Sequence, residues 1–258
     1  MRVRVLAAVL VIACGCQPIP STEPMHYLRP QARGPVAESV VMCTFDVITL
    51  PRSQYDKFEQ LWQYMEMGGT YGPTEKVLAL NGLKVGRTDM RFGTQFTQAY
   101  QGLQPGPRRV TFVRIGEGNR QTFDVGEVLQ EETLFVWTTP DSLIGRHFSQ
   151  VRYSMCLTLE KVKEKTADFE VSWQARTGRA LNRNVNISSL EIQAVLEEGQ
   201  SLVIGPADFT GRGVGRAFLS GVEEKAVQMT FFVITPTEIN KKTELPGDRA
   251  STPRENES

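Results

Sequence analysis

The sequence predicts an α+β protein in which a small α/β unit is followed by a mostly antiparallel β domain. Two observations support this prediction. Large apolar residues recur at helical spacing within 55–103, whereas within 151–176 they alternate with polar residues in period two. A Pro-Gly-Pro turn at 105–107 separates the two patterns. We therefore expect an α/β unit at 38–105 and an antiparallel β domain at 106–236.

The composition is that of an ordinary globular protein. Of the 258 residues, 40% are hydrophobic and 22% are charged, and Lys plus Arg equals Asp plus Glu at 29 each. Because the charge is balanced, the sequence shows neither a strongly basic chain suited to nucleic acid nor a strongly acidic one. We expect no nucleic-acid partner.

Residues 1–16 are predicted to be a lipoprotein signal peptide ending in a lipobox. Two arginines precede the apolar run 5–12, which is too short to span a bilayer. The small residues that follow resemble the bacterial lipobox, in which a cysteine receives diacylglycerol. Cys14 fits this pattern better than the alternative, Cys16, because Cys14 has an apolar residue three places before it. An ordinary secretory signal cut by another peptidase is the other interpretation.

The lipobox resemblance implies a lipid-anchored protein of the bacterial cell envelope. The residue after either cysteine is Gly15 or Gln17, not the Asp that favours inner-membrane retention. We therefore expect the outer membrane, on its periplasmic side, rather than the inner membrane. Acyl chains such as palmitate would hold the protein there, since each buried methylene contributes about 0.8 kcal/mol. The Pro-rich segment 17–37 predicts a semi-extended tether.

The α/β unit begins with a strand at 40–50. This strand carries apolar residues on both faces, which predicts that both faces are covered. Helical spacing and turn signals predict the other elements of the unit, which are helices at 55–65, 74–80 and 92–103 and a short strand at 83–85.

The β domain is expected to consist of short strands. Two clean period-two runs, joined by the charged turn 161–168, predict an antiparallel hairpin with one wet face. Pro236 is expected to end the last strand, and the polar segment 237–258 to be a disordered tail. The predicted strands are 110–115, 121–125, 133–138, 151–159, 169–176, 190–196, 201–204 and 226–235.

The last two strands carry a family resemblance. The segment GQSLVIG at 199–205, followed by VITP at 233–236, resembles the end of the core module of bacterial secretins. Secretins are ring-forming outer-membrane channels of type II and type III secretion and of type IV pili. The resemblance covers roughly 151–236 and implies a secretin-like β module and self-association. The chain departs from the family in having Gly205-Pro206 where a glycine pair is usual, and a polar segment after Pro236.

Two cysteines, Cys43 and Cys156, remain in the folded part of an exported chain, where a disulfide is chemically permitted. The alternation of 151–159 places Cys156 on the otherwise polar face of its strand, which would leave it available. We expect either a Cys43–Cys156 disulfide or two unpaired thiols, with Cys43 packed as a small apolar group.

The remaining chemistry-bearing residues do not predict catalysis. His147 is the sole histidine of the folded part, and neither a second histidine nor a C-x-x-C motif lies near it to suggest zinc. No G-x-S-x-G motif accompanies it. We expect no metal, no cofactor and no enzymatic activity. The Gly-rich loop between the last two strands offers Arg212, Arg216 and Phe218 as a candidate interaction site.

Together these features predict a non-catalytic envelope lipoprotein that is a structural or assembly component with a secretin-like β module. The alternative is an envelope lipoprotein that binds a cell-wall polymer or a partner protein through its β domain. In both cases the expected partners are the membrane, through the N-terminal lipid, and other proteins, with self-association among the options.

Overall fold

The computed structural model describes residues 39–67, 70–103, 108–178, 181, 183–207, 213–223 and 226–241. All of them belong to one compact unit, Ala37–Ser258. The predicted tether, the Pro-Gly-Pro turn at 105–107 and the tail from 242 onward lie outside the described residues.

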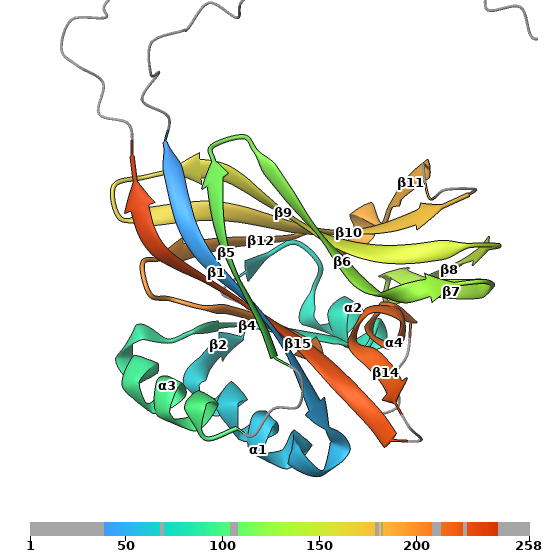
Figure 1. The fold of residues 1–258 in the computed structure, drawn as a ribbon, viewed down its shortest axis with the longest axis horizontal. Coiled ribbons are helices and arrows are strands. Elements are labelled where there is room, and N and C mark those ends of the chain that lie inside the picture. Colours follow the sequence, from blue (N-terminus) through green and yellow to red (C-terminus); the bar gives the residue numbers. More distant parts are fainter. Residues whose placement is uncertain are drawn as a thin grey trace, which may run out of the picture. The chain divides into compact units, whose positions relative to one another are not determined.

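Sheet A, the largest of the three antiparallel sheets formed by the described residues, contains strands from both halves of the chain (Figure 1). Its strands are β1 (Val40–Pro51), β2 (Met65–Met67), β4 (Leu83–Thr88), β5 (Arg108–Gly116), β13 (Leu202–Pro206), β14 (Ser220–Glu223) and β15 (Ala226–Asn240). Their order is β2-β4-β13-β15-β1-β5, and β14 pairs with β15. The two strands that carry the secretin resemblance, β13 and β15, are antiparallel neighbours.

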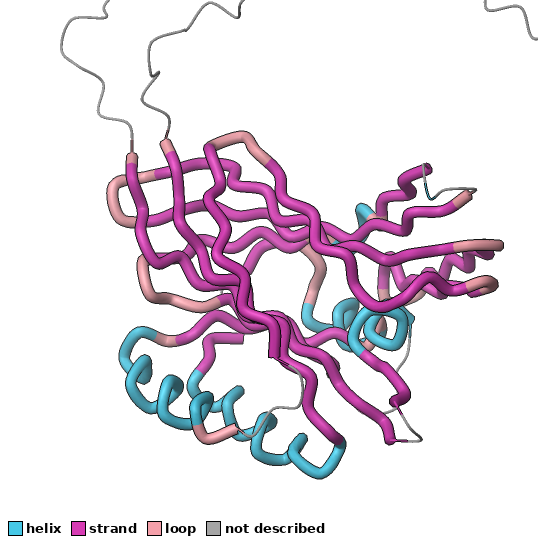
Figure 2. Tube along the Cα trace, in the orientation of Figure 1, coloured by secondary structure: helices cyan, strands magenta, loops and turns pink. Residues whose placement is uncertain are grey.

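Sheet B lies over one face of sheet A (Figure 2). Its strands are β3 (Thr70–Tyr71), β6 (Arg120–Leu129), β9 (Val151–Val162), β10 (Thr166–Thr177), β11 (Arg183–Asn186) and β12 (Ile192–Glu197). Their order is β3-β12-β10-β9-β6, and β11 pairs with β10. The predicted hairpin is confirmed, because β9 and β10 pair along most of their length. The α+β class is confirmed as well.

The inner core fills the space between the two sheets. Strand alternation directs every second side chain into it, among them Phe45 of β1, Trp173 of β10 and Phe232 of β15. The opposite face of β1 contributes Ile48 and Leu50 to a second apolar cluster. Both faces of β1 are therefore covered, as its apolar pattern predicts.

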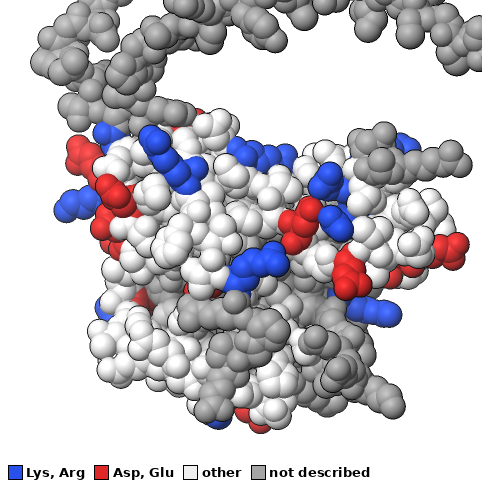
Figure 3. All heavy atoms as spheres, in the orientation of Figure 1, with Lys and Arg blue, Asp and Glu red and all other residues white. Residues whose placement is uncertain are grey.

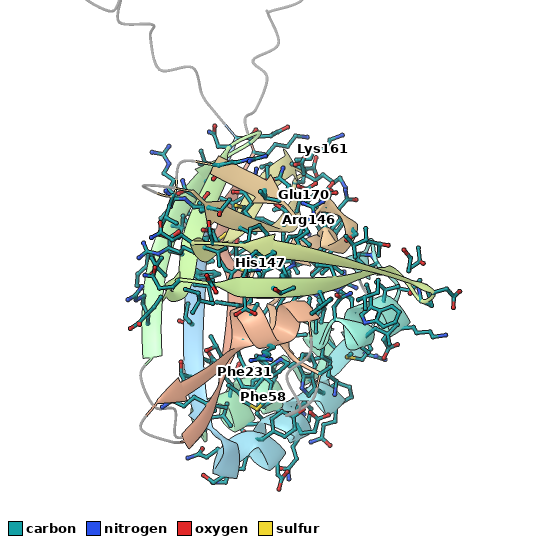
Figure 4. The ribbon with its side chains drawn as sticks, turned by 90° about the vertical axis from the view of Figure 1, so that its right-hand side faces the viewer. Phe58, Arg146, His147, Lys161, Glu170 and Phe231 are labelled. Atoms are coloured by element: carbon teal, nitrogen blue, oxygen red, sulfur yellow. The ribbon has the colours of Figure 1, made fainter. Side chains whose placement is uncertain are left out.

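A helix layer covers the outer face of sheet A, on the side away from sheet B (Figure 1). It consists of η1 (Arg52–Gln54), α1 (Tyr55–Glu59), η2 (Gln60–Tyr64), η3 (Met90–Phe92) and α3 (Gly93–Gln101). Phe58 and Trp62 are its main anchors, and Phe58 packs on Phe231 of β15 (Figure 4). The predicted helix at 55–65 is confirmed up to residue 64, because Met65 already begins β2.

Two short helices and a hairpin lie at one end of the inner core. They are α2 (Glu75–Leu80), α4 (Gly213–Leu219) and the hairpin of β7 (Glu132–Thr139) and β8 (Ser142–Phe148). A further turn of 3-10 helix, η5 (Ser188–Leu190), precedes β12. Asn81, at the C-terminus of α2, is fully buried and binds both backbone groups of Trp137, with its Nδ2 2.8 Å from the carbonyl and its Oδ1 2.9 Å from the N–H.

The predicted α/β unit and β domain are not separate in the fold. β1, from the first segment, lies between β5 and β15, from the second, so both segments build sheet A. The boundary at 105–107 divides two sequence patterns and not two units. Periodicity reports the faces of a strand, and it carries no information about which distant strand lies beside it.

The predicted end of the last strand at Pro236 is wrong, because β15 continues to Asn240. Proline removes a backbone donor and is tolerated at irregular positions of a sheet. The register with β1 shifts at this point, where Cys43 pairs with Pro236 and Met42 with Glu238, so that Thr237 is the extra residue. Thr237 Oγ1 donates to the Met42 carbonyl at 3.1 Å.

Candidate functional site

Several predicted site residues lie outside the described part of the chain. These are both candidates for the lipid anchor, Cys14 and Cys16, and one residue of the candidate interaction loop, Arg212.

Cys43 and Cys156 are both free thiols, and both are buried. Cys43 faces the inner core, where burial raises the pKa of its thiol to about 12. Cys156 lies between Met155 and Leu157, which face the inner core, so alternation directs it to the outer face of sheet B. The two thiols therefore point to different layers and form no disulfide. Cys156 is also fully buried, 3.6 Å from Thr122 Oγ1, and the prediction that it is available was wrong.

The candidate interaction loop contains a helix, α4. Phe218 is 2% exposed and packs on Tyr153 and Trp173, with ring centroids 4.6 and 4.8 Å away. Phe218 is therefore an inner-core residue, and its prediction as an interaction residue was wrong. Arg216, on the same helix, is exposed. Helical geometry separates the two, because residues two apart face different directions.

His147 lies exposed on β8, next to Arg146 (Figure 4). Its Nδ1 is 3.1 Å from Thr133 Oγ1 on the paired strand β7. Within the residues that the structure describes, no three His, Cys, Asp or Glu side chains are grouped so that they could hold a metal ion.

The predicted wet face of the β9–β10 hairpin is a network of side chains that bind one another. At its centre, Asp124 of β6 accepts from Ser154 Oγ at 2.8 Å and pairs with Arg152 and Arg176, each at 3.3 Å. Burial alone would raise the pKa of Asp124, but the Ser154 hydrogen bond and the two guanidinium groups hold it below its usual value. The three charged side chains thus bind one another and the buried Ser154, although the buried Arg152 Nε has no hydrogen-bond partner in the described part of the chain.

The edge of β5 is a long exposed side of sheet A. Its nine residues pair with β1 without a register shift, and no strand of the described residues pairs with its other side. Val110 and Phe112 are exposed there, Phe112 to 75%, next to exposed Arg109 and Arg114. Figure 3 shows this side as largely uncharged, with separate basic and acidic groups. We call Val110, Phe112 and the two arginines the β5 edge.

The hairpin of β7 and β8 offers a second apolar surface. Phe135 and Leu143 are 51% and 47% exposed on one face of the hairpin, and the exposed carboxylates Glu131 and Asp141 stand at the two ends of β7. Ile144, 44% exposed, lies on the opposite face, across from Val136. We call Phe135, Leu143 and the two carboxylates the hairpin surface. The exposed Arg146 lies on the other face of the hairpin, across from Leu134. The hairpin and the β5 edge occupy different sides of the unit (Figures 1 and 4).

A groove of ≈ 400 Å³ lies on the outer face of sheet A, beside α3. We call it the sheet A groove. Its floor is a row of hydroxyl side chains from neighbouring strands, Asp46 stands next to this row, and α3 forms a wall. The residues that define it are Thr44, Asp46, Thr88, Phe96, Tyr100, Ser201 and Thr235.

Sequence reasoning missed the sheet A groove. A signal was present, because Thr44 and Asp46 interrupt a face of strand 40–50 that is otherwise apolar. The partners of this pair come from positions more than forty residues away, such as Tyr100, whose hydroxyl donates to Asp46 Oδ2 at 2.8 Å. Such a pairing is not visible in one sequence.

A second hollow, of ≈ 430 Å³, lies beside α2. Lys84, which lines it, is paired with Glu59 and lies over the Trp62 ring, 4.8 Å from its centroid. The Lys84 ammonium group is therefore already paired within the fold.

The geometry defines a β-sandwich of two antiparallel sheets with a helix layer on one of them. Comparison with protein-family models, with curated proteins and with solved structures finds no match. Among the described residues, no helix is both long and apolar enough to cross a membrane.

Proposed function

We propose that this chain is a non-catalytic, lipid-anchored protein of the bacterial cell envelope, a structural or assembly component that associates with copies of itself. The observation that carries this proposal is the β5 edge. A nine-residue strand in regular register, with Phe112 75% exposed, is a template for contact with another chain.

Three other edges of sheets A and B carry features that disfavour such contact. β6, at the edge of sheet B, has a bulge between Val125 and Leu129, and Gly126 there has a φ of +68°. β2 and β3, at the far edges of the two sheets, have three and two residues. Short and bulged edges pair poorly, so the β5 edge stands apart from them.

Charge complementarity supports a second copy as the occupant. The β5 edge combines apolar residues with Arg109 and Arg114, whereas the hairpin surface combines apolar residues with Glu131 and Asp141. Two β5 edges facing each other would bring arginines together, and a β5 edge on a hairpin surface would not. Such a head-to-tail contact joins different surfaces and generates a ring or a filament. The secretin resemblance, carried by the paired strands β13 and β15, is consistent with a ring.

The test is light scattering of the chain without residues 1–37 over a concentration series. We expect a concentration-dependent oligomer, and monomers for Phe112→Lys and for Leu143→Lys. Phe92→Lys, at an exposed phenylalanine outside both surfaces, is the matched control and should assemble normally. Mixing the two defective variants should give dimers only, because each retains one intact surface. A monomer at every concentration, or unchanged assembly of Phe112→Lys, would overturn the proposal.

The anchor has its own test. Cys14→Ala should move the full chain from the membrane fraction to the soluble envelope fraction, because the modified cysteine carries the acyl chains. Cys16→Ala is the matched control and should leave the protein in the membrane. The opposite pattern would place the lipid on Cys16, and release by neither substitution would contradict a lipid anchor.

The alternative function, a module that binds a cell-wall polymer or a partner protein, is supported by the sheet A groove. A buried carboxylate next to a row of hydroxyl groups is an arrangement that recognises a polar ligand.

A further inference from the structure

We propose that the sheet A groove binds a small saccharide that is neutral or carries an amino group. This inference rests on the alternative function, a binding module, and it is independent of self-association. Its volume of ≈ 400 Å³ lies within the range of about 300–1,000 Å³ for small-molecule sites.

The floor of the groove is a row of hydroxyl groups that crosses four strand positions. Thr44 and Thr235 are paired residues of β1 and β15. Ser201 Oγ lies 2.6 Å from Thr235 Oγ1, and the Ser201 N–H donates to Thr88 Oγ1 at 2.8 Å. Each hydroxyl can both donate and accept, as the hydroxyl groups of a sugar do. Part of this capacity is used within the fold, because Ser201 and Thr235 bind each other and Thr44 Oγ1 donates to the Thr235 carbonyl at 3.5 Å. The remaining donor and acceptor positions of the row are what it offers a ligand.

Asp46 lies one step along β1 from this row, towards the helix layer. It is 7% exposed, and the Tyr100 hydroxyl donates to its Oδ2 at 2.8 Å. A carboxylate in this position accepts hydrogen bonds from ligand hydroxyl or ammonium groups and repels anions. Among the described residues that line the groove there is no Lys or Arg. Arg91, next to the lining residue Met90, is held by the Asp89 carboxylate.

The wall of the groove is apolar. Phe96 of α3 is buried and stacks with Tyr100, with ring centroids 5.7 Å apart and planes at 12°. Val233 of β15 and Met90 line the same hollow, and Met90 is half exposed at its side. A sugar ring has polar edges and an apolar C–H face, so it can place its hydroxyl groups on the floor and its C–H face on this wall.

The charge of the site orders the ligands by affinity. Glucosamine carries an ammonium group, N-acetylglucosamine is neutral, and glucuronate is an anion. Because Asp46 attracts the first and repels the last, we expect glucosamine to bind best, N-acetylglucosamine next and glucuronate at least tenfold more weakly than glucosamine.

The experiment is a titration of the chain without residues 1–37 with each of the three sugars, followed by NMR shifts of the groove residues. Asp46→Asn should weaken glucosamine at least tenfold and remove most of its advantage over N-acetylglucosamine. Thr44→Val keeps the β-branched shape of the side chain, removes one floor hydroxyl and should weaken both sugars severalfold. It keeps the proposal testable if Asp46→Asn fails to fold.

Asp124→Asn is the matched control, since it removes a carboxylate from sheet B and should leave all three affinities unchanged. Absence of binding by every sugar, or glucuronate binding as tightly as glucosamine, would overturn the proposal. Leu143→Lys separates the two proposals, because Leu143 lies on the β7–β8 hairpin and not among the residues that line the groove, whereas Phe112 lies directly across from Thr44. It should abolish assembly while sugar binding persists, and sugar binding without assembly in the unsubstituted chain would contradict self-association alone.

Discussion

The outer faces of the two sheets carry similar polar side chains, yet they differ in what lies above them. On sheet B, the partly exposed Asp124 and two arginines bind one another above the buried Ser154, which donates to Asp124. On sheet A, the hydroxyl row and Asp46 lie at the border of the helix layer, where a hollow of ≈ 400 Å³ remains. A polar row on a strand therefore does not by itself predict a site. The element that covers the sheet decides whether the row becomes a surface network or the floor of a groove.

Removing the main anchor of the helix layer is expected to cause the largest loss of stability among the substitutions proposed. Phe58 is fully buried against Phe231. Phe58→Ala should lower the free energy of unfolding by about 3–5 kcal/mol, because it leaves a cavity between the helix layer and sheet A. Urea unfolding measures this change. Where the variant still folds, it should also lose sugar binding, since α3 forms the wall of the groove.

Phe135→Ala is the matched control for that substitution. Phe135 is 51% exposed on β7, so its removal should change stability by about 0.5 kcal/mol or less. A loss in Phe58→Ala as small as the one expected for Phe135→Ala would mean that the helix layer does not depend on Phe58. Sugar binding by a folded Phe58→Ala protein would separate the groove from the helix layer.

The sequence predicted the elements better than their arrangement. Period two identified β9 and β10, and helical spacing identified α1 with η2, because local periodicity reflects which face is buried. The shared sheet was not predictable in this way, because β1 pairs with a strand almost two hundred residues later. The same reason hid the sheet A groove, whose lining comes from several distant segments.

The glycines of α4 led to the wrong prediction that this segment is entirely a loop. The run around Gly213 and Gly215 predicts a loop, yet this segment forms a helix. A Cβ on Gly215 would lie 2.2 Å from the Gly82 carbonyl oxygen, and the Gly215 N–H donates to the Asn81 carbonyl at 2.7 Å. Glycine is present here because α4 approaches the end of α2 closely. A single sequence does not distinguish this reason from flexibility.

The two cysteines allow the apolar inner core around Cys43 to be compared with the more polar outer face of sheet B around Cys156. Cys43→Ser should destabilise the protein by about 1–3 kcal/mol, since it places a hydroxyl in the inner core. Cys156→Ser should cost less than about 1 kcal/mol, because Thr122 Oγ1 is near enough to serve as a partner. Thermal unfolding of both variants measures the difference. An equal loss, or a disulfide on a non-reducing gel, would contradict the placement of these thiols on different faces.

The smallest expected effect concerns the charge of Asp124. Asp124→Asn keeps an acceptor for Ser154 and removes the charge that pairs with Arg152 and Arg176. Because the Asp124 side chain is 39% exposed, water and salt screen both ion pairs, and we expect a loss of only about 0.5–1 kcal/mol at neutral pH.

The pH dependence of this loss identifies its cause. The folded-state pKa of Asp124 is lowered, so its charge stabilises the protein above the ordinary Asp pKa of about 3.9, and this contribution disappears as the pH falls through the lower folded-state value. The difference between the unsubstituted chain and Asp124→Asn should therefore be full at pH 7 and vanish in acid well below pH 3.9. Urea unfolding at both pH values, with and without added salt, measures it. A difference that persists unchanged in acid would assign the stabilisation to the geometry of the Ser154 hydrogen bond and not to the charges around Asp124.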